Sequence, residues 1–228
     1  MATDTDDAFL YERLHTAPGI KLEIVSGGSG YSPRASRMLA CQVWCENARD
    51  GYRAIDHTDA GAPLLSADYP ESERQRISVS HTHGLFAVAT LPVAPEGTDI
   101  EQFSPQTALG LDVESATRSK ALDVRERFLN EEELQLVDSG DVLANIIAWT
   151  CKEAMLKLTF NTSADIRKDL IITSLPDTAG HEGKGVAKLP DGTSVDVRLH
   201  TVAVCEGRYV ATLGFTDSTL RFGKKQPE

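Results

Sequence analysis

Stretches in which apolar and polar residues alternate recur along the chain, and each predicts a strand with one buried face. The clearest is 108–114, Ala-Leu-Gly-Leu-Asp-Val-Glu, which ends in two acids. Side chains two apart on a strand share a face, so Asp112 and Glu114 should project together while Leu111 and Val113 face the other way. The other predicted strands are 20–25, 77–81, 85–90, 184–188, 194–204 and 208–215.

Apolar residues at helical spacing predict two main helices, 33–47 and 146–158. In the second, Trp149, Glu153 and Lys157 are spaced four apart and therefore share one face. If that face is solvated, the Glu and Lys form only a weak surface pair. If it looks inward from the large ring of Trp149, both charged groups need buried partners.

Shorter helical segments are predicted at 119–122, 125–129 and 130–134. Asn130 is a candidate N-cap, and Glu133 stands three residues on, as a relaxed capping box requires. The first 18 residues carry a short helical pattern, formed by Phe9, Leu10 and Leu14.

The stretch 91–105 is rich in Pro, Gly and acids and is typical of a connector. It divides the chain into an N-terminal lobe, 1–105, and a C-terminal lobe, 106–228. Each half holds helix and strand segments of similar extent. We therefore expect an α+β fold of two similar lobes with antiparallel sheets, and not a doubly wound parallel sheet.

The composition, with 41% hydrophobic and 25% charged residues among 228, is that of an ordinary globular protein. The formal net charge of −11 argues against a general nucleic-acid binder or a binder of anionic membranes. No run approaches the roughly 18 apolar residues of a membrane span. The acidic start lacks an apolar signal region, and the four cysteines form no Cys-x-x-Cys pair, so we expect a cytoplasmic protein with reduced thiols.

The acidic pair at Asp112 and Glu114 is the first candidate for chemistry. Two neighbouring carboxylates repel each other and are costly to bury unless a cation joins them. Mg²⁺ fits, because it commonly takes one or two protein carboxylates together with phosphate oxygens and water. A solvated strand edge would explain this pair alone equally well. Glu153 would add a third carboxylate, and Lys157 a cation for a phosphate.

Five short motifs together resemble the 4′-phosphopantetheinyl transferase superfamily. Gly-Leu-Asp-Val-Glu at 110–114 is similar to the family's G-x-D-x-E, and Arg-Phe-Leu at 127–129 with Glu133 to its R-F-F with a following Glu. Trp-Thr-Cys-Lys-Glu-Ala-Met-Leu-Lys at 149–157 is similar to W-x-x-K-E-A-x-x-K. Upstream, 80–84 resembles S-H-S/T-x-G and 61–65 resembles G-K-P-x-L. Order and spacing agree from about residue 60 to 160.

The resemblance implies transfer of the 4′-phosphopantetheine arm from coenzyme A to a serine of an apo acyl or peptidyl carrier protein, with release of 3′,5′-ADP. The length is similar to the large, surfactin-synthetase-activating class, in which two lobes of one polypeptide make a single site at their junction. It therefore implies a monomer, with coenzyme A contacts from the first lobe and metal ligands from the second. A link to fatty-acid biosynthesis is one of several that the resemblance allows.

The resemblance also assigns roles to the acidic cluster and its lysine. Asp112, Glu114 and Glu153 would hold Mg²⁺ against the pyrophosphate, although Mn²⁺ stays open. Glu153 is also the candidate base, directly or through water, for the serine proton. Lys157 would sit against a phosphate oxygen of the leaving group, where its charge favours the transition state.

Coenzyme A contacts are expected from four further residues. His81 would hold the 3′-phosphate, helped by the hydroxyl or backbone N–H of Thr82, and Lys152 would meet another phosphate. The family commonly has Lys where this chain has Ala62, so Arg37, or Arg34 beside it, is expected to supply the missing charge. A structural histidine at 81 is the alternative.

A locally basic stretch follows the acidic strand and is expected to form part of the face that binds the acidic carrier protein. Its residues are Arg118, Lys120, Arg125 and Arg127. Two other functions stay open: a different Mg²⁺-dependent enzyme acting on a pyrophosphate or phosphoester, and a non-catalytic module that binds coenzyme A or carrier proteins.

Overall fold

The structure of the chain is a computed structural model, and it describes residues 10–16, 20–26, 55–57, 63–65, 77–90 and 108–216. The predicted helix at 33–47, with Arg34 and Arg37, lies outside these residues, as do Ala62 and the connector 91–105. The described residues thus include segments from both sides of that connector.

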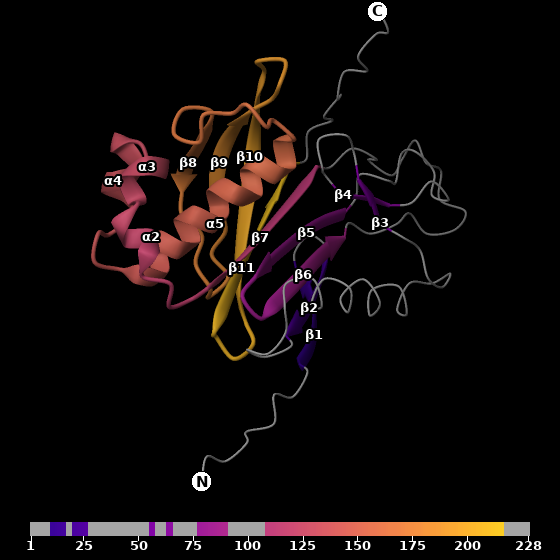
Figure 1. Cartoon of the computed structure of the whole chain (residues 1–228). Coiled ribbons are helices and arrows are strands. Elements are labelled where there is room, and N and C mark those ends of the chain that lie inside the picture. The colour runs from indigo at the N-terminus through magenta and orange to yellow at the C-terminus, as the bar shows by residue number, and fades with distance from the viewer. Residues whose placement is uncertain are drawn as a thin grey trace, which may run out of the picture.

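The C-terminal part is a five-stranded antiparallel sheet in the order β7-β11-β10-β9-β8 (Figure 1). β7 and β8 are its two edge strands. The strands are β7 (Leu109–Ser115), β8 (Leu170–Ser174), β9 (Gly183–Lys188), β10 (Ser194–Val204) and β11 (Tyr209–Phe215). Four were predicted from alternation, whereas β8 was not.

The N-terminal part contains a four-stranded antiparallel sheet in the order β1-β2-β6-β5 and a separate pair, β3-β4. β5, an edge strand of this sheet, packs beside β7, an edge strand of the other (Figure 1). The strands are β1 (Leu10–Thr16), β2 (Ile20–Ser26), β3 (Ile55–His57), β4 (Pro63–Leu65), β5 (Ile77–Thr82) and β6 (Leu85–Thr90).

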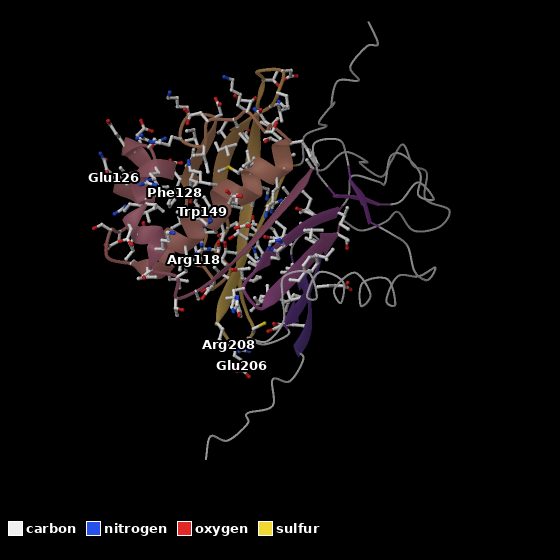
Figure 2. The ribbon with its side chains drawn as sticks, in the orientation of Figure 1. Arg118, Glu126, Phe128, Trp149, Glu206 and Arg208 are labelled. Carbon is white, nitrogen blue, oxygen red and sulfur yellow. The ribbon has the colours of Figure 1, made fainter. Side chains whose placement is uncertain are left out.

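Within residues 108–216, the structure has four helices: α2 (Lys120–Asp123), α3 (Arg125–Phe128), α4 (Glu131–Leu136) and α5 (Val142–Thr159). The capping box predicted before α4 is confirmed. Asn130 accepts from the backbone N–H of Glu133 at 2.9 Å, and the Glu133 carboxylate accepts from the backbone N–H of Asn130 at 2.8 Å. Trp149 of α5 meets Phe128 of α3 edge to face, with ring centroids 5.1 Å apart (Figure 2).

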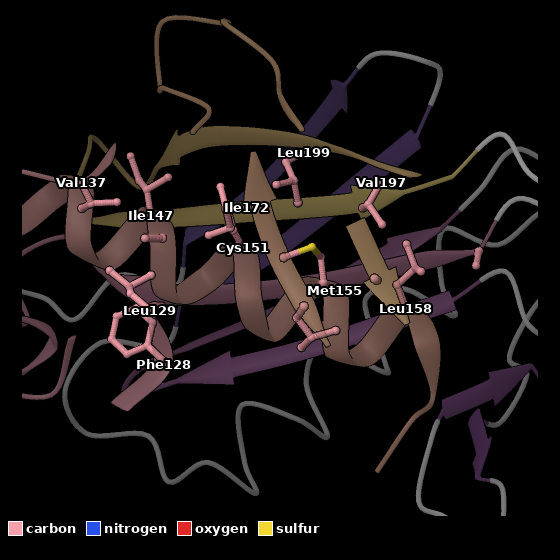
Figure 3. Packing of buried hydrophobic residues seen from close by; sticks show 14 of the residues in the cluster. Phe128, Leu129, Val137, Ile147, Cys151, Met155, Leu158, Ile172, Val197 and Leu199 are labelled. Atoms are coloured by element: carbon pink, nitrogen blue, oxygen red, sulfur yellow. The ribbon is translucent and has the colours of Figure 1, made fainter. Parts of the chain in front are cut away.

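Two hydrophobic clusters hold these layers together. The first lies between α5 and the five-stranded sheet, where Cys151, Met155 and Leu158 of the helix pack on strand residues such as Ile172 and Leu199 (Figure 3). The second joins the two sheets. It combines residues of β2 and β6 with the opposite face of β7 and β11, and it includes Leu22, Ala87, Leu111, Val113 and Leu213.

The helical pattern expected near the N-terminus is wrong. Residues Leu10–Thr16 form β1, which pairs antiparallel with β2 from Leu10 opposite Ser26 to Thr16 opposite Ile20. Apolar residues four apart, such as Leu10 and Leu14, fit a strand face as well as a helix face. The partner strand, which local periodicity does not reveal, decides between the two.

The fold class expected from the sequence is confirmed as α+β with antiparallel sheets. Within the described ranges, no helix combines the length and the apolar character needed to cross a membrane.

Candidate functional site

The acidic strand β7 projects its two carboxylates as its alternation predicts. Leu111 and Val113 enter the cluster between the sheets, so their neighbours Asp112 and Glu114 lie on the other face. α5 covers that face of the sheet (Figure 1). Asp112 of β7 therefore meets Lys157 of α5.

A glycine allows α5 to approach the acidic strand closely. A Cβ built on Gly110 would overlap the carbonyl oxygen of Ala154 and come within 2.8 Å of the Leu158 backbone nitrogen. Backbone atoms of a buried helix cannot move aside, so no other residue fits there without displacing α5. Gly110 thus determines how closely α5, which carries Glu153 and Lys157, packs on β7.

Lys157 reaches the acidic strand directly. Its ammonium donates to Asp112 Oδ1 at 2.7 Å, to Ser80 Oγ at 3.0 Å and to the carbonyl oxygen of Leu111 at 2.9 Å. The lysine side chain is 30% exposed, whereas that of Asp112 is 9% exposed. One cation therefore joins β5, β7 and α5 while keeping some access to solvent.

Hydroxyls on β5 complete the surroundings of the two acids. Ser80 Oγ donates to Asp112 Oδ1 at 2.8 Å, and Thr82 Oγ1 donates to Glu114 Oε2 at 3.1 Å. The other oxygen of Glu114, Oε1, accepts from Arg118 at 2.6 Å. Each carboxylate of β7 thus has one oxygen bound by a hydroxyl from the N-terminal part.

Burial and neighbouring negative charges shift the pKa values of two acids in this site. Burial raises the pKa of Asp112, and the negative charge of Glu114 raises it further, while Lys157 and the Ser80 hydroxyl lower it. Burial likewise raises the pKa of Glu153, with the charges of Asp112 and Glu114 adding to the shift and Lys157 opposing it. The negative charges of this site therefore favour protonation of Asp112 and Glu153.

The cluster has the donor chemistry of a divalent-cation site. Asp112 Oδ2 is buried, and among the described residues it has no hydrogen-bond partner. A buried carboxylate oxygen without a partner is costly unless a cation or water meets it. In the described part of the chain, no three His, Cys, Asp or Glu side chains are gathered closely enough to hold a metal. The residues fit Mg²⁺ by type and charge, but the ligand set is not preassembled.

Lys152 does not join this cluster. Its ammonium pairs with Glu133 Oε1 at 2.6 Å and donates to the carbonyl oxygens of Ile166, at 3.1 Å, and Leu170. Its side chain is 0% exposed and that of Glu133 is 1% exposed. An ammonium enclosed in this way does not reach solvent, which argues against the coenzyme A contact predicted for Lys152.

The remaining predicted residues lie near the end of β5 or outside the described ranges. His81 is exposed, on the face of β5 opposite Ser80 and Thr82. The turn after β5 is held by Tyr209, whose hydroxyl donates to the carbonyl oxygen of His83 at 3.2 Å. Arg37 lies outside the described residues.

Of the basic stretch, Arg118, Lys120 and Arg127 are exposed. Arg125 instead donates to the carbonyl oxygens of Leu134, at 3.3 Å, and Val137, at 2.6 Å, so it caps the end of α4.

Ser80 and Gly110 enter the sequence-based prediction only as parts of motifs, and their places in the site were not predicted. A signal for the serine exists: Ser-Val-Ser-His-Thr at 78–82 puts a hydroxyl at every second position of a predicted strand. What such a row faces depends on a segment about thirty residues further along the chain, and periodicity does not give it.

Comparison with known families bears on the segment that carries the acidic strand and α5. Residues 108–213 match the family model of the 4′-phosphopantetheinyl transferase superfamily. A search of curated proteins gave no match. The matched segment contains Asp112, Glu114, Glu153 and Lys157, which belong to the motifs that resemble this family. Over residues 108–213, the chain is therefore similar to the 4′-phosphopantetheinyl transferase superfamily.

Proposed function

We propose that the protein transfers 4′-phosphopantetheine from coenzyme A to a serine of an apo acyl or peptidyl carrier protein. The serine oxygen forms a bond to the β-phosphorus of the coenzyme A pyrophosphate, the P–O bond to the other phosphate breaks, and 3′,5′-ADP leaves. The observation that carries the proposal is the cluster of Asp112, Glu114, Glu153 and Lys157 within the family-matched segment.

Asp112, Glu114 and Glu153 would hold Mg²⁺, which supplies charge neutralisation at the pyrophosphate oxygens when bound. Asp112 offers its buried Oδ2, since its Oδ1 already accepts from Lys157 and Ser80. Glu114 would give up its Arg118 contact or share that oxygen. These three residues are the chain's own contribution to binding the metal.

Glu153 is the proposed base. Its carboxylate takes the proton from the serine hydroxyl, directly or through water, as the oxygen attacks. Burial and the negative charges of Asp112 and Glu114 raise the pKa of Glu153 and so increase its affinity for a proton. Lys157, already at the edge of the cluster, would turn its partly exposed ammonium to a phosphate oxygen and stabilise the leaving group.

Coenzyme A contacts are proposed at His81 for the 3′-phosphate, at Thr82, and at Arg37 as the replacement for the family lysine. The carrier protein is proposed to dock against the exposed Arg118, Lys120 and Arg127, whose charge suits an acidic partner. A monomer acting in the cytoplasm is the expected setting.

The test is intact-mass spectrometry of several apo carrier proteins incubated with coenzyme A, Mg²⁺ and the protein. We expect one added phosphopantetheine per carrier, dependent on the metal and on Glu153. Glu153→Gln should reduce the rate about 10²–10³-fold, the scale seen when one stabilising group is removed from a charged transition state. Glu132→Gln, the same change at an exposed position of α4, should leave the rate unchanged.

The outcomes separate the alternatives. Phosphate release from nucleotides with no carrier modified would favour another Mg²⁺-dependent phosphoester enzyme. Bound coenzyme A without any transfer would favour a binding module. Unchanged transfer by Glu153→Gln would refute the assignment of the base.

A further inference from the structure

A row of hydroxyls runs along one face of β5. Ser78, Ser80 and Thr82 alternate with Val79 and His81, so the three hydroxyls share a face. This face meets β7, whose outward backbone groups have no neighbouring strand in their own sheet. The hydroxyls therefore occupy the place where a sixth strand would otherwise pair.

Successive hydroxyls of this row contact successive positions along β7. Ser78 Oγ accepts from the Leu111 N–H at 2.9 Å, and Ser80 Oγ accepts from the Val113 N–H at 3.3 Å. Ser80 and Thr82 also donate to Asp112 Oδ1 and Glu114 Oε2. Two residues of strand span about 6.6–6.8 Å, so consecutive hydroxyls suit consecutive carboxylates of β7.

Ser80 does more than cap the strand edge. An aspartate carboxylate has a broad terminal torsion, and either oxygen could face Lys157. The Ser80 hydroxyl donates to Oδ1 and accepts from the same ammonium that binds Oδ1, with Ser80 Oγ to Lys157 Nζ at 3.0 Å. This bond fixes Oδ1 on the lysine and leaves Oδ2, which has no partner among the described residues, for a cation.

We infer that Ser80 and Thr82 are positioning residues that set the orientation of Asp112 and Glu114 for a divalent cation. The inference rests on the proposed function only in taking this acidic pair as the metal site. It adds that residues 80 and 82, which lie outside the family-matched segment 108–213, complete that site. The site then depends on the N-terminal part for its metal affinity as well as for coenzyme A.

The test is a Mn²⁺ titration of the full chain, followed by the electron paramagnetic resonance signal of unbound Mn²⁺, without coenzyme A or carrier protein. Ser80→Ala should weaken Mn²⁺ binding about 10-fold or more, the usual effect of losing a hydrogen bond that orients a metal ligand. Thr82→Val, of nearly equal shape, should weaken it several-fold. Thr82→Ser, which keeps the hydroxyl, should bind within about twofold of wild type.

Ser78→Ala is the matched control, because Ser78 lies on the same strand face and caps a backbone N–H but contacts no carboxylate among the described residues. It should leave Mn²⁺ affinity within about twofold. Thermal unfolding of each variant establishes that the titration is made on folded protein. If Ser80→Ala does not fold, the pair Thr82→Val and Thr82→Ser decides.

Equal Mn²⁺ affinity in wild type, Ser80→Ala and Thr82→Val would overturn the inference, and so would an equal loss in Ser78→Ala. A wild type that binds no Mn²⁺ would overturn it as well. Mn²⁺ binding with the expected pattern, but without phosphopantetheine transfer, would uphold the inference and refute the proposed function.

Discussion

Both edges of the five-stranded sheet are closed by side chains, and an ion pair between a lysine and a carboxylate lies at each edge. At β8, the outward N–H of Ile172 donates to Glu133 at 2.6 Å, and the outward carbonyl of Leu170 accepts from Lys152. The two charged groups also pair with each other, and neither is more than 1% exposed. One carboxylate meets one ammonium, so the charges are balanced inside the protein.

At β7, the outward groups are closed by Ser78, Ser80 and Lys157. Here Lys157 faces Asp112, with Glu114 and Glu153 acting on the same site. Carboxylates outnumber the cations, Lys157 and Arg118, that contact them in the described residues. The balance and the exposure of charge, and not the presence of a lysine and a carboxylate, therefore separate a structural ion pair from a candidate active site.

The largest expected effect on stability comes from removing one partner of the Lys152–Glu133 ion pair at the β8 edge. Lys152→Met leaves Glu133 buried without its cation, which should lower the free energy of unfolding by about 3–5 kcal/mol. Urea denaturation measures the change. Glu133→Gln combined with Lys152→Met removes both charges and should be less destabilised than the single variant.

Lys168→Met is the control for this prediction, because Lys168 is 81% exposed and its pair with Asp165 is on the surface. Its stability should change by less than about 0.5 kcal/mol. A Lys152→Met protein as stable as Lys168→Met would show that the β8 pair is not structural.

At the β7 edge of the sheet, removing a charge is expected to raise the free energy of unfolding, opposite to the effect of Lys152→Met. Burial and neighbouring acids raise the pKa of Glu153 in the folded state, so its ionisation destabilises the fold at neutral pH. Glu153→Gln should therefore raise the free energy of unfolding by about 0.5–2 kcal/mol at pH 7 while abolishing most activity. Thermal unfolding as a function of pH measures this.

The pH dependence comes from the direction of that shift. Between the unfolded pKa and the raised folded pKa, the folded state binds more protons, so wild-type stability falls as pH rises through this window. The advantage of Glu153→Gln should shrink as pH drops through the raised pKa and disappear below the ordinary value of 4.5. A constant difference from neutral to acidic pH would contradict this explanation. Glu132→Gln should show no such advantage.

The smallest expected effect is on carrier-protein binding, at the exposed basic residues that follow β7. Lys120→Glu should raise the KM for the carrier protein a few-fold at low salt, less than about 1 kcal/mol, and the effect should fade as salt screens the charges. Lys184→Glu, an equal charge change at an exposed position of β9, is the control. Equal KM values for the two variants at low salt would rule out docking at this face.

The sequence predicted those features of the site that depend on local periodicity. Alternation placed Asp112 and Glu114 on one face, and four-residue spacing placed Glu153 and Lys157 on one face of α5. Lys152 was assigned to a phosphate from the resemblance to the family. Its enclosure depends on Glu133 and β8, and such tertiary partners leave no periodic signal.

The contact of Ser80 with Asp112 also leaves no periodic signal in the sequence, because 32 residues separate the two in the chain. The strand β1 was misread for a related reason: its spacing suits two structures, and pairing with β2 selects one. Packing between distant segments therefore accounts for each of these differences between the sequence-based expectations and the structure.

The most direct test compares Lys152 and Glu153, neighbours on α5 that face opposite edges of the five-stranded sheet. Initial rates of phosphopantetheine transfer to an apo carrier protein should be measured for Lys152→Met and Glu153→Gln, at a temperature where both are folded. Lys152→Met should keep its rate within about threefold, whereas Glu153→Gln should lose about 10²–10³-fold. Equal losses in both variants would contradict this expectation, because Lys152 would then belong to the chemistry and not to the closed edge of the sheet.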